Sequence, residues 1–135
     1  MQVIKWRESY ETGIKSMDKQ HHDLIELIND LFVSIRGKEQ NPDAEKILER
    51  CFEYADKHLQ EEERLLMEHG YPELQEQLDS HNEFKKKISD LKREFSSKPE
   101  VLLSESYTYL RKWWIDHIVG IDKKYGEFLQ TKGVE

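Results

Sequence analysis

The sequence predicts an all-α fold, an up-down-up-down four-helix bundle with an N-terminal arm. Four long segments repeat apolar residues at spacings of three and four, as helices with one buried face do. Short connections separate these segments, and the 135-residue chain holds only six Gly and three Pro, so long helices are allowed. We expect one domain over residues 1–135. An open pair of helical hairpins that dimerises is the alternative, but the arm and four amphipathic faces favour closure within one chain.

The first 15 residues are expected to form a non-helical arm, because Gly13 interrupts any helix there. Ser16 is a candidate N-cap for a first helix that runs to about Arg36, where Gly37 can end it. The apolar residues of this helix recur at helical spacing, which predicts its buried face. They are Leu24, Leu27, Ile28, Leu31, Phe32 and Ile35.

The second helix has clear start and stop signals. Asn41 can cap it, and Pro42 suits its first position. Gly70 can take a left-handed backbone conformation and Pro72 cannot continue a helix, so the segment 69–72 is expected to end it. The predicted buried face mixes small, apolar and polar residues: Cys51, Ala55, His58, Glu62 and Leu66.

The third and fourth helices are expected at 74–95 and from about Pro99 to Gln130, separated by Ser96–Lys98. The third has the most regular pattern, with inward positions Leu74, Gln77, His81, Phe84, Ile88, Leu91 and Phe95. The inward positions of the fourth are Leu103, Tyr107, Leu110, Trp114, His117, Ile121 and Tyr125.

Composition excludes several classes of function. The sequence has no apolar run of about 18 residues, which excludes a membrane span, and its first 20 residues lack the apolar core of a signal peptide. Cys51 is the single cysteine, so no internal disulfide can form. These features favour the reducing cytoplasm. The net charge of −7 argues against a nucleic-acid partner.

Polar residues occur where the bundle should be apolar. His21, His58, His81 and His117 each fall on the inward face of a different helix, and Glu62 lies one turn after His58. Helices one and three begin at the end of the bundle where two and four finish, so these side chains should meet in one layer. Buried imidazoles and carboxylates are costly unless they are paired or bind metal.

A metal site is the better explanation of this layer. A single core histidine is usually only packed, but four with a carboxylate are improbable as packing. Imidazole and carboxylate donors without thiolate suit iron, zinc or manganese and disfavour a structural zinc site. Asp122 is harder to place, because five residues after His117 is about 140° further round an ideal helix. With Asp122 and Gln77, seven donor positions would suit two bridged ions.

Four short motifs carry a family resemblance. The segments 18–21, 58–62, 77–81 and 117–122 read D-x-Q-H, H-x-x-x-E, Q-x-x-x-H and H-x-x-x-x-D. In these motifs, in the Gly-Tyr-Pro turn and in the arm, the chain resembles the bacterial single-domain haemerythrins over nearly its whole length. Myohaemerythrin is a known up-down-up-down bundle, so the resemblance implies the same fold.

The resemblance implies two non-haem iron ions, joined by a solvent-derived oxygen, and dioxygen as ligand. It implies that His21 and His58 bind one iron, which keeps an open position. The positions at the second iron are those of Gln77, His81 and His117. The two carboxylates that bridge the irons are Glu62 and Asp122. The positions that would wall the oxygen pocket or lie close to the irons are Leu59, Trp113, Trp114, Ile118 and Tyr125.

Two residues depart from the family pattern. Gln77 stands where the family has histidine, and its amide could bind iron through oxygen, leave a water there or leave a gap. Trp114 stands where the family usually has leucine and should narrow the pocket. We therefore expect a dioxygen carrier, store or sensor. A di-iron peroxidase, oxidase or nitric oxide scavenger, favoured by Gln77, and an iron store or structural metal site remain alternatives.

Overall fold

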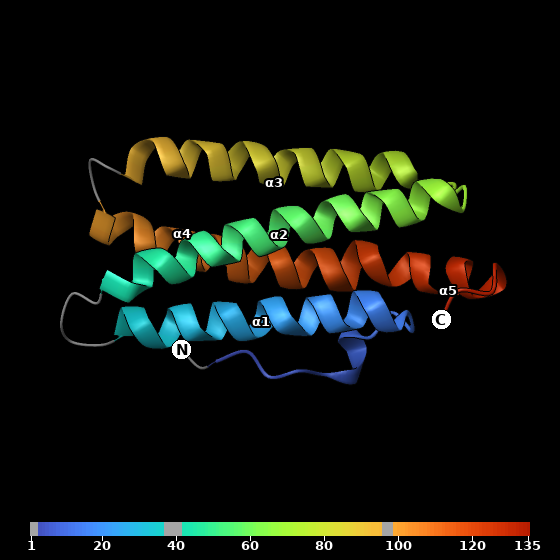
Figure 1. Cartoon of the computed structure of the whole chain (residues 1–135), viewed down its shortest axis with the longest axis horizontal. Helices are drawn as coiled ribbons and strands as arrows, with labels where there is room; N and C mark the ends of the chain where they lie inside the picture. The colour runs from blue at the N-terminus through green and yellow to red at the C-terminus, as the bar shows by residue number, and fades with distance from the viewer. Residues whose placement is uncertain (1–2, 37–41, 96–98) are drawn as a thin grey trace.

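The computed structural model describes residues 3–36, 42–95 and 99–135. After a short 3-10 helix η1 (Glu8–Tyr10), its helices are α1 (Lys15–Arg36), α2 (Pro42–Glu68), α3 (Leu74–Phe95), α4 (Pro99–His117), the π-helical η2 (Ile118–Asp122) and α5 (Lys123–Thr131). The last three form one continuous rod. The four rods run alternately up and down along one axis (Figure 1), which confirms the predicted fold. The predicted roles of Gly37, Asn41 and Ser96–Lys98 lie outside the described residues.

The N-terminal arm is a non-helical segment held against α1. The backbone of Ile4 exchanges two hydrogen bonds with the side chain of Asn29, at 2.7 and 2.8 Å. The Asp18 carboxylate accepts hydrogen bonds from the backbone N–H groups of Thr12 and Gly13, and from the Thr12 hydroxyl. The helix therefore begins at Lys15, and the predicted cap at Ser16 is wrong: Asp18 in the first turn fixes the chain that enters it.

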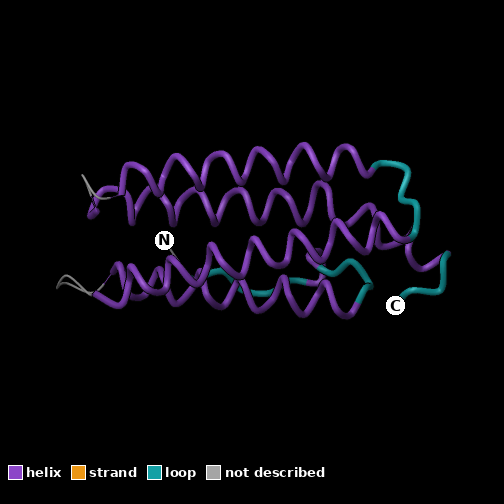
Figure 2. Tube along the Cα trace, turned by 45° about the horizontal axis from the view of Figure 1, so that its top comes forward, coloured by secondary structure: helices purple, strands orange, loops and turns teal. Residues whose placement is uncertain are grey.

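The same arm crosses α5 at Gly126. A Cβ atom on Gly126 would lie 1.9 Å from the carbonyl oxygen of Thr12, far inside van der Waals contact. Only glycine allows the two backbones to approach so closely. Outside the helices the described chain is loop, chiefly this arm, the turn after α2 and the C-terminal residues (Figure 2). In that turn Gly70 has a φ of +66°, as its sequence context predicted.

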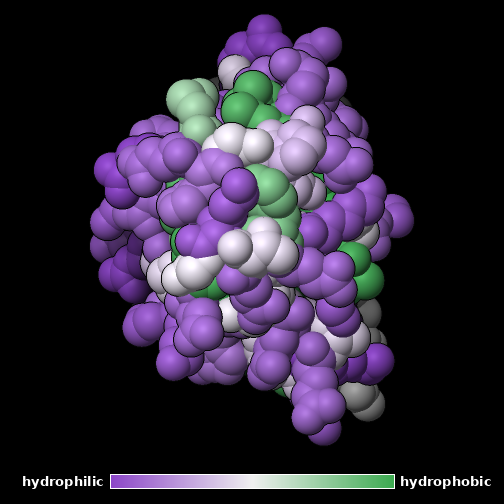
Figure 3. All heavy atoms as spheres, turned by 90° about the vertical axis from the view of Figure 1, so that its right-hand side faces the viewer, coloured by the Kyte–Doolittle hydropathy of each residue, from purple (hydrophilic) through white to green (hydrophobic). Residues whose placement is uncertain are grey.

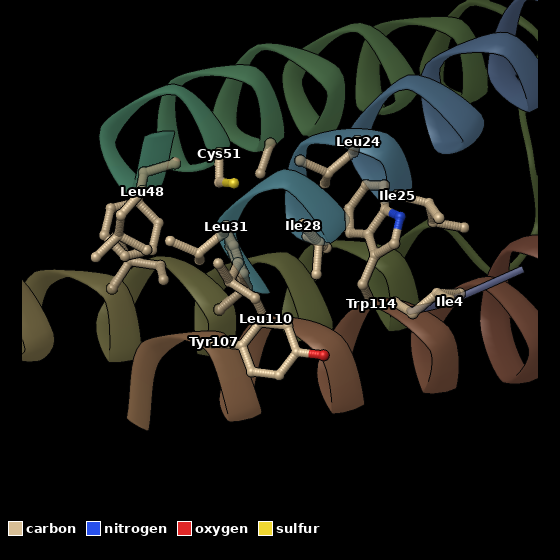
Figure 4. Close-up of a cluster of buried hydrophobic side chains, with 14 of the residues drawn as sticks. Ile4, Leu24, Ile25, Ile28, Leu31, Leu48, Cys51, Tyr107, Leu110 and Trp114 are labelled. Atoms are coloured by element: carbon tan, nitrogen blue, oxygen red, sulfur yellow. The ribbon is translucent and has the colours of Figure 1, made fainter. Parts of the chain in front are cut away.

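Two hydrophobic clusters fill the bundle, with a polar layer between them. The larger cluster occupies the half that ends at the α1–α2 and α3–α4 connections, and Leu24, Ile28, Cys51, Leu110 and Trp114 point into it from α1, α2 and α4 (Figure 4). The smaller cluster lies beyond the polar layer, at the end of the bundle that carries the α2–α3 turn. It consists of Ile14, Met17, Leu66, Tyr71, Tyr125 and Leu129.

The outside of that second end is mostly hydrophilic, with small hydrophobic groups interspersed (Figure 3). The polar layer is thus closed off by apolar side chains beneath a polar surface. Among the described residues no helix has the length and apolar character needed to cross a membrane.

Candidate metal centre

All seven predicted donor residues lie in the polar layer, and each is at most 2% exposed: His21, His58, Glu62, Gln77, His81, His117 and Asp122. They come from all four rods. The early turns of α1 and α3 and the late turns of α2 and the last rod meet at the same height, as alternating helix directions require. The layer therefore collects imidazole, carboxylate and amide groups in a site buried from bulk solvent.

The four histidines form two pairs. The Nε2 atoms of His21 and His58 are 3.1 Å apart, and those of His81 and His117 are 3.2 Å apart. Two nitrogens that bind one transition-metal ion at about 2.1 Å and at right angles would be about 3 Å apart. Each pair is therefore spaced like neighbouring ligands of one ion.

The carboxylate of Glu62 faces both pairs, with one oxygen toward each. Its Oε2 lies 3.5 Å from His21 Nε2 and 3.2 Å from His58 Nε2. Its Oε1 lies 3.0 Å from His81 Nε2 and 3.5 Å from His117 Nε2. This is the arrangement of a carboxylate that can bridge two ions.

Asp122 faces both pairs in the same way. Its Oδ2 lies 3.0 Å from His21 Nε2 and its Oδ1 lies 2.9 Å from His117 Nε2. The π-helical turn η2, Ile118–Asp122, makes this possible. Because a π-helix bonds residue i to i+5, it brings Asp122 round to the face of His117. The 140° offset of an ideal α-helix, which made Asp122 hard to place from the sequence, therefore does not apply to this turn.

Gln77 enters the layer from α3, one turn before His81. Its Nε2 donates a hydrogen bond of 2.9 Å to Asp122 Oδ1. Its Oε1 is buried without a hydrogen-bond partner among the described residues. The amide thus contacts a bridging carboxylate, and its oxygen faces space that no side chain satisfies.

Three polar residues that the motif analysis did not assign hold the outer edges of the histidine rings. The Nδ1 atoms of His58, His81 and His117 lie 2.6 Å from Gln20 Oε1, 3.0 Å from Glu63 Oε1 and 2.9 Å from Ser80 Oγ, respectively. With its proton on Nδ1 and donated outward, each neutral ring would keep Nε2 free to bind metal.

These partners follow a simple sequence signal. Gln20, Glu63 and Ser80 each stand next to an inward donor on their own helix and reach a histidine on the neighbouring helix. Glu61 and Glu63 flank Glu62 in the charged run 60–64 and are half-buried. Glu63 contacts His81, and Glu61 accepts a hydrogen bond from Gln20.

Charge in the layer is balanced. Burial opposes protonation of the imidazoles, but Asp122 and Glu62 outweigh it and raise the pKa of His21 to about 9 and that of His117 to about 10. Burial also disfavours both carboxylate ions, yet the histidines hold the pKa of Glu62 well below its usual value and lower that of Asp122. Burial dominates at His58 and lowers its pKa. Two imidazolium and two carboxylate groups therefore face each other, and metal cations can replace the two protons.

The aromatic residues predicted near the site lie on both sides of it. The Trp114 ring is edge-on to His21 and His58, with ring centroids 5.6 and 5.3 Å apart. Trp113 stacks on His117 at 4.5 Å. The Tyr125 hydroxyl donates to Glu62 Oε2 at 2.8 Å. Leu59 and Ile118 are fully buried in the larger hydrophobic cluster.

The donor groups fit two metal ions on three grounds. Inward Nε2 atoms are paired at ligand spacing, two carboxylates span the pairs, and hydrogen bonds at Nδ1 fix three of the four rings from behind. Two groups of donor atoms are close enough to hold an ion each, His21, His58, Glu62 and Asp122 in one and Glu62, His81 and His117 in the other. Buried nitrogen and oxygen donors without sulfur suit iron or another divalent transition metal.

Known proteins are similar to this chain in sequence and in fold. Residues 12–129 match the family described as "Hemerythrin HHE cation binding domain". The chain is 30% identical to a bacteriohemerythrin of Pseudomonas aeruginosa strain LESB58, over 93% of this chain and 80% of the relative. It is 28% identical to a bacteriohemerythrin of Stenotrophomonas maltophilia strain R551-3, over 94% and 82%.

A more distant relative is the myohemerythrin of Theromyzon tessulatum, 24% identical over 90% of this chain and 89% of the relative. Among solved structures, a haemerythrin mutant with leucine replaced by tyrosine superposes with a TM-score of 0.79 at 22% identity, over 94% of this chain and 97% of that one. The buried histidine and carboxylate groups thus occur in a chain that matches a cation-binding family almost from end to end. The chain belongs to the haemerythrin family.

Proposed function

We propose that this protein is a non-haem di-iron protein that binds dioxygen as a carrier, store or sensor. The observation that carries the proposal is the symmetric use of the two carboxylates. Glu62 and Asp122 each direct one oxygen to the His21 side and the other to the His117 side, which suits two ions held close together. The names of the relatives, bacteriohemerythrin and myohemerythrin, support the same reading.

The iron ions would supply the electrons and the open position that dioxygen binding needs. His21 and His58 would hold the ion with the open position, and His81 and His117 the other. Gln20 and Ser80 orient His58 and His117 from behind, so the Nε2 lone pairs point into the layer.

The remaining residues shape the surroundings of the first ion. Trp114, Leu59 and Ile118 are fully buried, and Trp114 lies against both His21 and His58. Apolar walls exclude water and slow the loss of reactive ligands. Tyr125 donates to Glu62, which fixes that carboxylate in its bridging orientation.

The test is an absorption spectrum of the iron-loaded, reduced protein before and after air, with iron per chain measured on the same sample. About two irons per chain and visible bands that appear with oxygen and disappear on deoxygenation are expected for reversible binding. About one iron or none would overturn the di-iron proposal.

A second function, a di-iron peroxidase, oxidase or nitric oxide scavenger, is favoured by one observation. An amide, that of Gln77, is buried in the layer one turn before His81, where a histidine would offer a third imidazole on the side of His81 and His117. Gln77 directs a nitrogen to Asp122 in that region. Direct passage to an oxidised spectrum without a reversible species, together with turnover of peroxide or nitric oxide, would identify this function.

A further inference from the structure

The amide of Gln77 is placed beside the donor atoms of the second ion and not among them. The imidazole and carboxylate atoms of the layer form a closed set, in which each atom lies 2.9–3.5 Å from another member. Gln77 joins this set only through its nitrogen, which donates to Asp122 Oδ1. Its Oε1 has no hydrogen-bond partner among the described residues, although the side chain is fully buried.

A buried amide oxygen without a partner is unfavourable, so a group that donates to it is expected in the complete site. The position of the amide narrows the choice of that group. Asp122 Oδ1, which holds the Gln77 nitrogen, lies 2.9 Å from His117 Nε2. The unpaired oxygen therefore lies next to the ion that His81 and His117 would bind. A water or hydroxide on that ion would be the nearest O–H donor.

We propose that Gln77 does not ligate the second ion, which keeps a coordination position for an exchangeable small ligand. The amide N–H positions Asp122, and the amide oxygen accepts a hydrogen bond from water, hydroxide or another small O–H ligand in that position. This inference rests on the proposed two-ion centre and adds a second binding position to it. The ligand class is a small anion or neutral molecule of two or three heavy atoms.

A groove lies on the same side of the bundle, at the outer edge of His117. It has a volume of about 830 Å³, runs between α3 and α4, and is lined in part by Ser80, Trp113 and His117. Trp114 instead lies against His21 and His58, on the other side of the centre. The groove therefore borders the His117 side of the layer, and Trp114 borders the His21 side.

The experiment compares the full-length protein with two variants whose side chains can fill the position, Gln77→His and Gln77→Glu. Each is loaded with cobalt(II), metal per chain is measured, and azide is titrated while visible absorption reports coordination. The wild-type protein is expected to take up one more azide per chain than either variant. Gln75→His, the same change at an exposed glutamine on α3, is the control and should match wild type.

The outcomes separate this inference from the proposed function. Fewer than two metal ions in the wild-type protein would overturn both. Two ions with equal azide uptake in wild type and in a folded, fully loaded variant would overturn the inference alone, because Gln77 would then already occupy the position. Two variants of different size and charge keep the test decisive if one of them does not fold.

Discussion

The carboxylate of Glu63 lies 3.0 Å from Nδ1 of His81, on the side of the ring that faces away from the metal layer. Gln20 and Ser80 present uncharged oxygens to the other rings. His81 is therefore the one histidine of the layer with a carboxylate bonded at Nδ1. A carboxylate at Nδ1 makes the imidazole a stronger metal donor. His81 lies on the side of the centre where Gln77 supplies an amide and not a third imidazole.

Replacement of Glu63 by glutamine tests this arrangement. Glu63→Gln keeps a hydrogen-bond acceptor but removes its charge, so we expect the affinity for the second metal ion to fall roughly 10- to 100-fold. The first ion, at His21 and His58, should bind as before. Stepwise metal titration of the metal-free protein measures both. Glu53→Gln, an exposed change on α2, is the control; equal affinities in all three proteins would contradict the role of Glu63.

Removal of the Tyr125 hydroxyl should destabilise the protein. The hydroxyl donates to the fully buried carboxylate of Glu62 at 2.8 Å, and no water can replace it there. Tyr125→Phe is expected to lower the free energy of unfolding of the metal-free protein by about 2 kcal/mol, as for a hydrogen bond to a charged group. Urea denaturation measures this. Tyr107→Phe removes a half-buried hydrogen bond to Arg111 and should cost less.

Metal binding should release protons at neutral pH. The pKa values of His21 and His117 are raised to about 9 and about 10, so both rings are positively charged imidazolium groups at pH 7 in the metal-free protein. A metal ion binds the neutral imidazole and not the imidazolium, so loading both ions at pH 7 should release about two protons per chain, one from each ring. Calorimetry of metal binding in buffers with different ionisation enthalpies counts them. Metal affinity that does not rise between pH 7 and pH 9 would argue against protonated rings.

The stability of the metal-free protein should depend on pH in a defined direction. The raised pKa of His21 contributes stability that is complete below 6.5 and is lost as the pH rises through about 9. The lowered pKa of Glu62 contributes stability that is present above 4.5 and is lost as the pH falls. The lowered pKa of His58 removes stability as the pH falls below 6.5, because the unfolded chain then takes up a proton that the buried ring resists. Maximum stability is therefore expected near pH 6.5, and chemical denaturation across pH 3–10 checks it. A maximum near pH 9 would contradict this assignment.

Gly126 should not tolerate a larger residue. An alanine Cβ would collide with the carbonyl oxygen of Thr12, so either the arm or α5 must move. We expect Gly126→Ala to lower stability by roughly 1–3 kcal/mol, the usual cost of overpacking. Gly120 in the same rod has open space around its Cβ position. Gly120→Ala should therefore be close to neutral in the same thermal or urea unfolding experiment.

Helical periodicity made most of the fold and the layer predictable. Residues such as His58 and Glu62 are spaced one turn apart on a buried face, so one helix pattern predicts where both point. Asp122 could not be placed this way, because its position depends on a π-helical turn that changes the helix repeat. Gln20 and Ser80 lie off the apolar faces. Their roles depend on which histidine of a neighbouring helix comes within reach, and the pattern of one helix does not contain that information.

The smaller hydrophobic cluster has a consequence for how metal can enter and leave. Its side chains come from the start of α1, the end of α2, the α2–α3 turn and α5, whereas the larger cluster draws on all four rods. Segments at chain ends open at a lower free energy than a central core does. Fraying of Ile14 and Leu129 can therefore expose the polar layer while the rest of the bundle stays folded. Metal exchange would then proceed by local opening, at a rate that the packing of the chain termini controls.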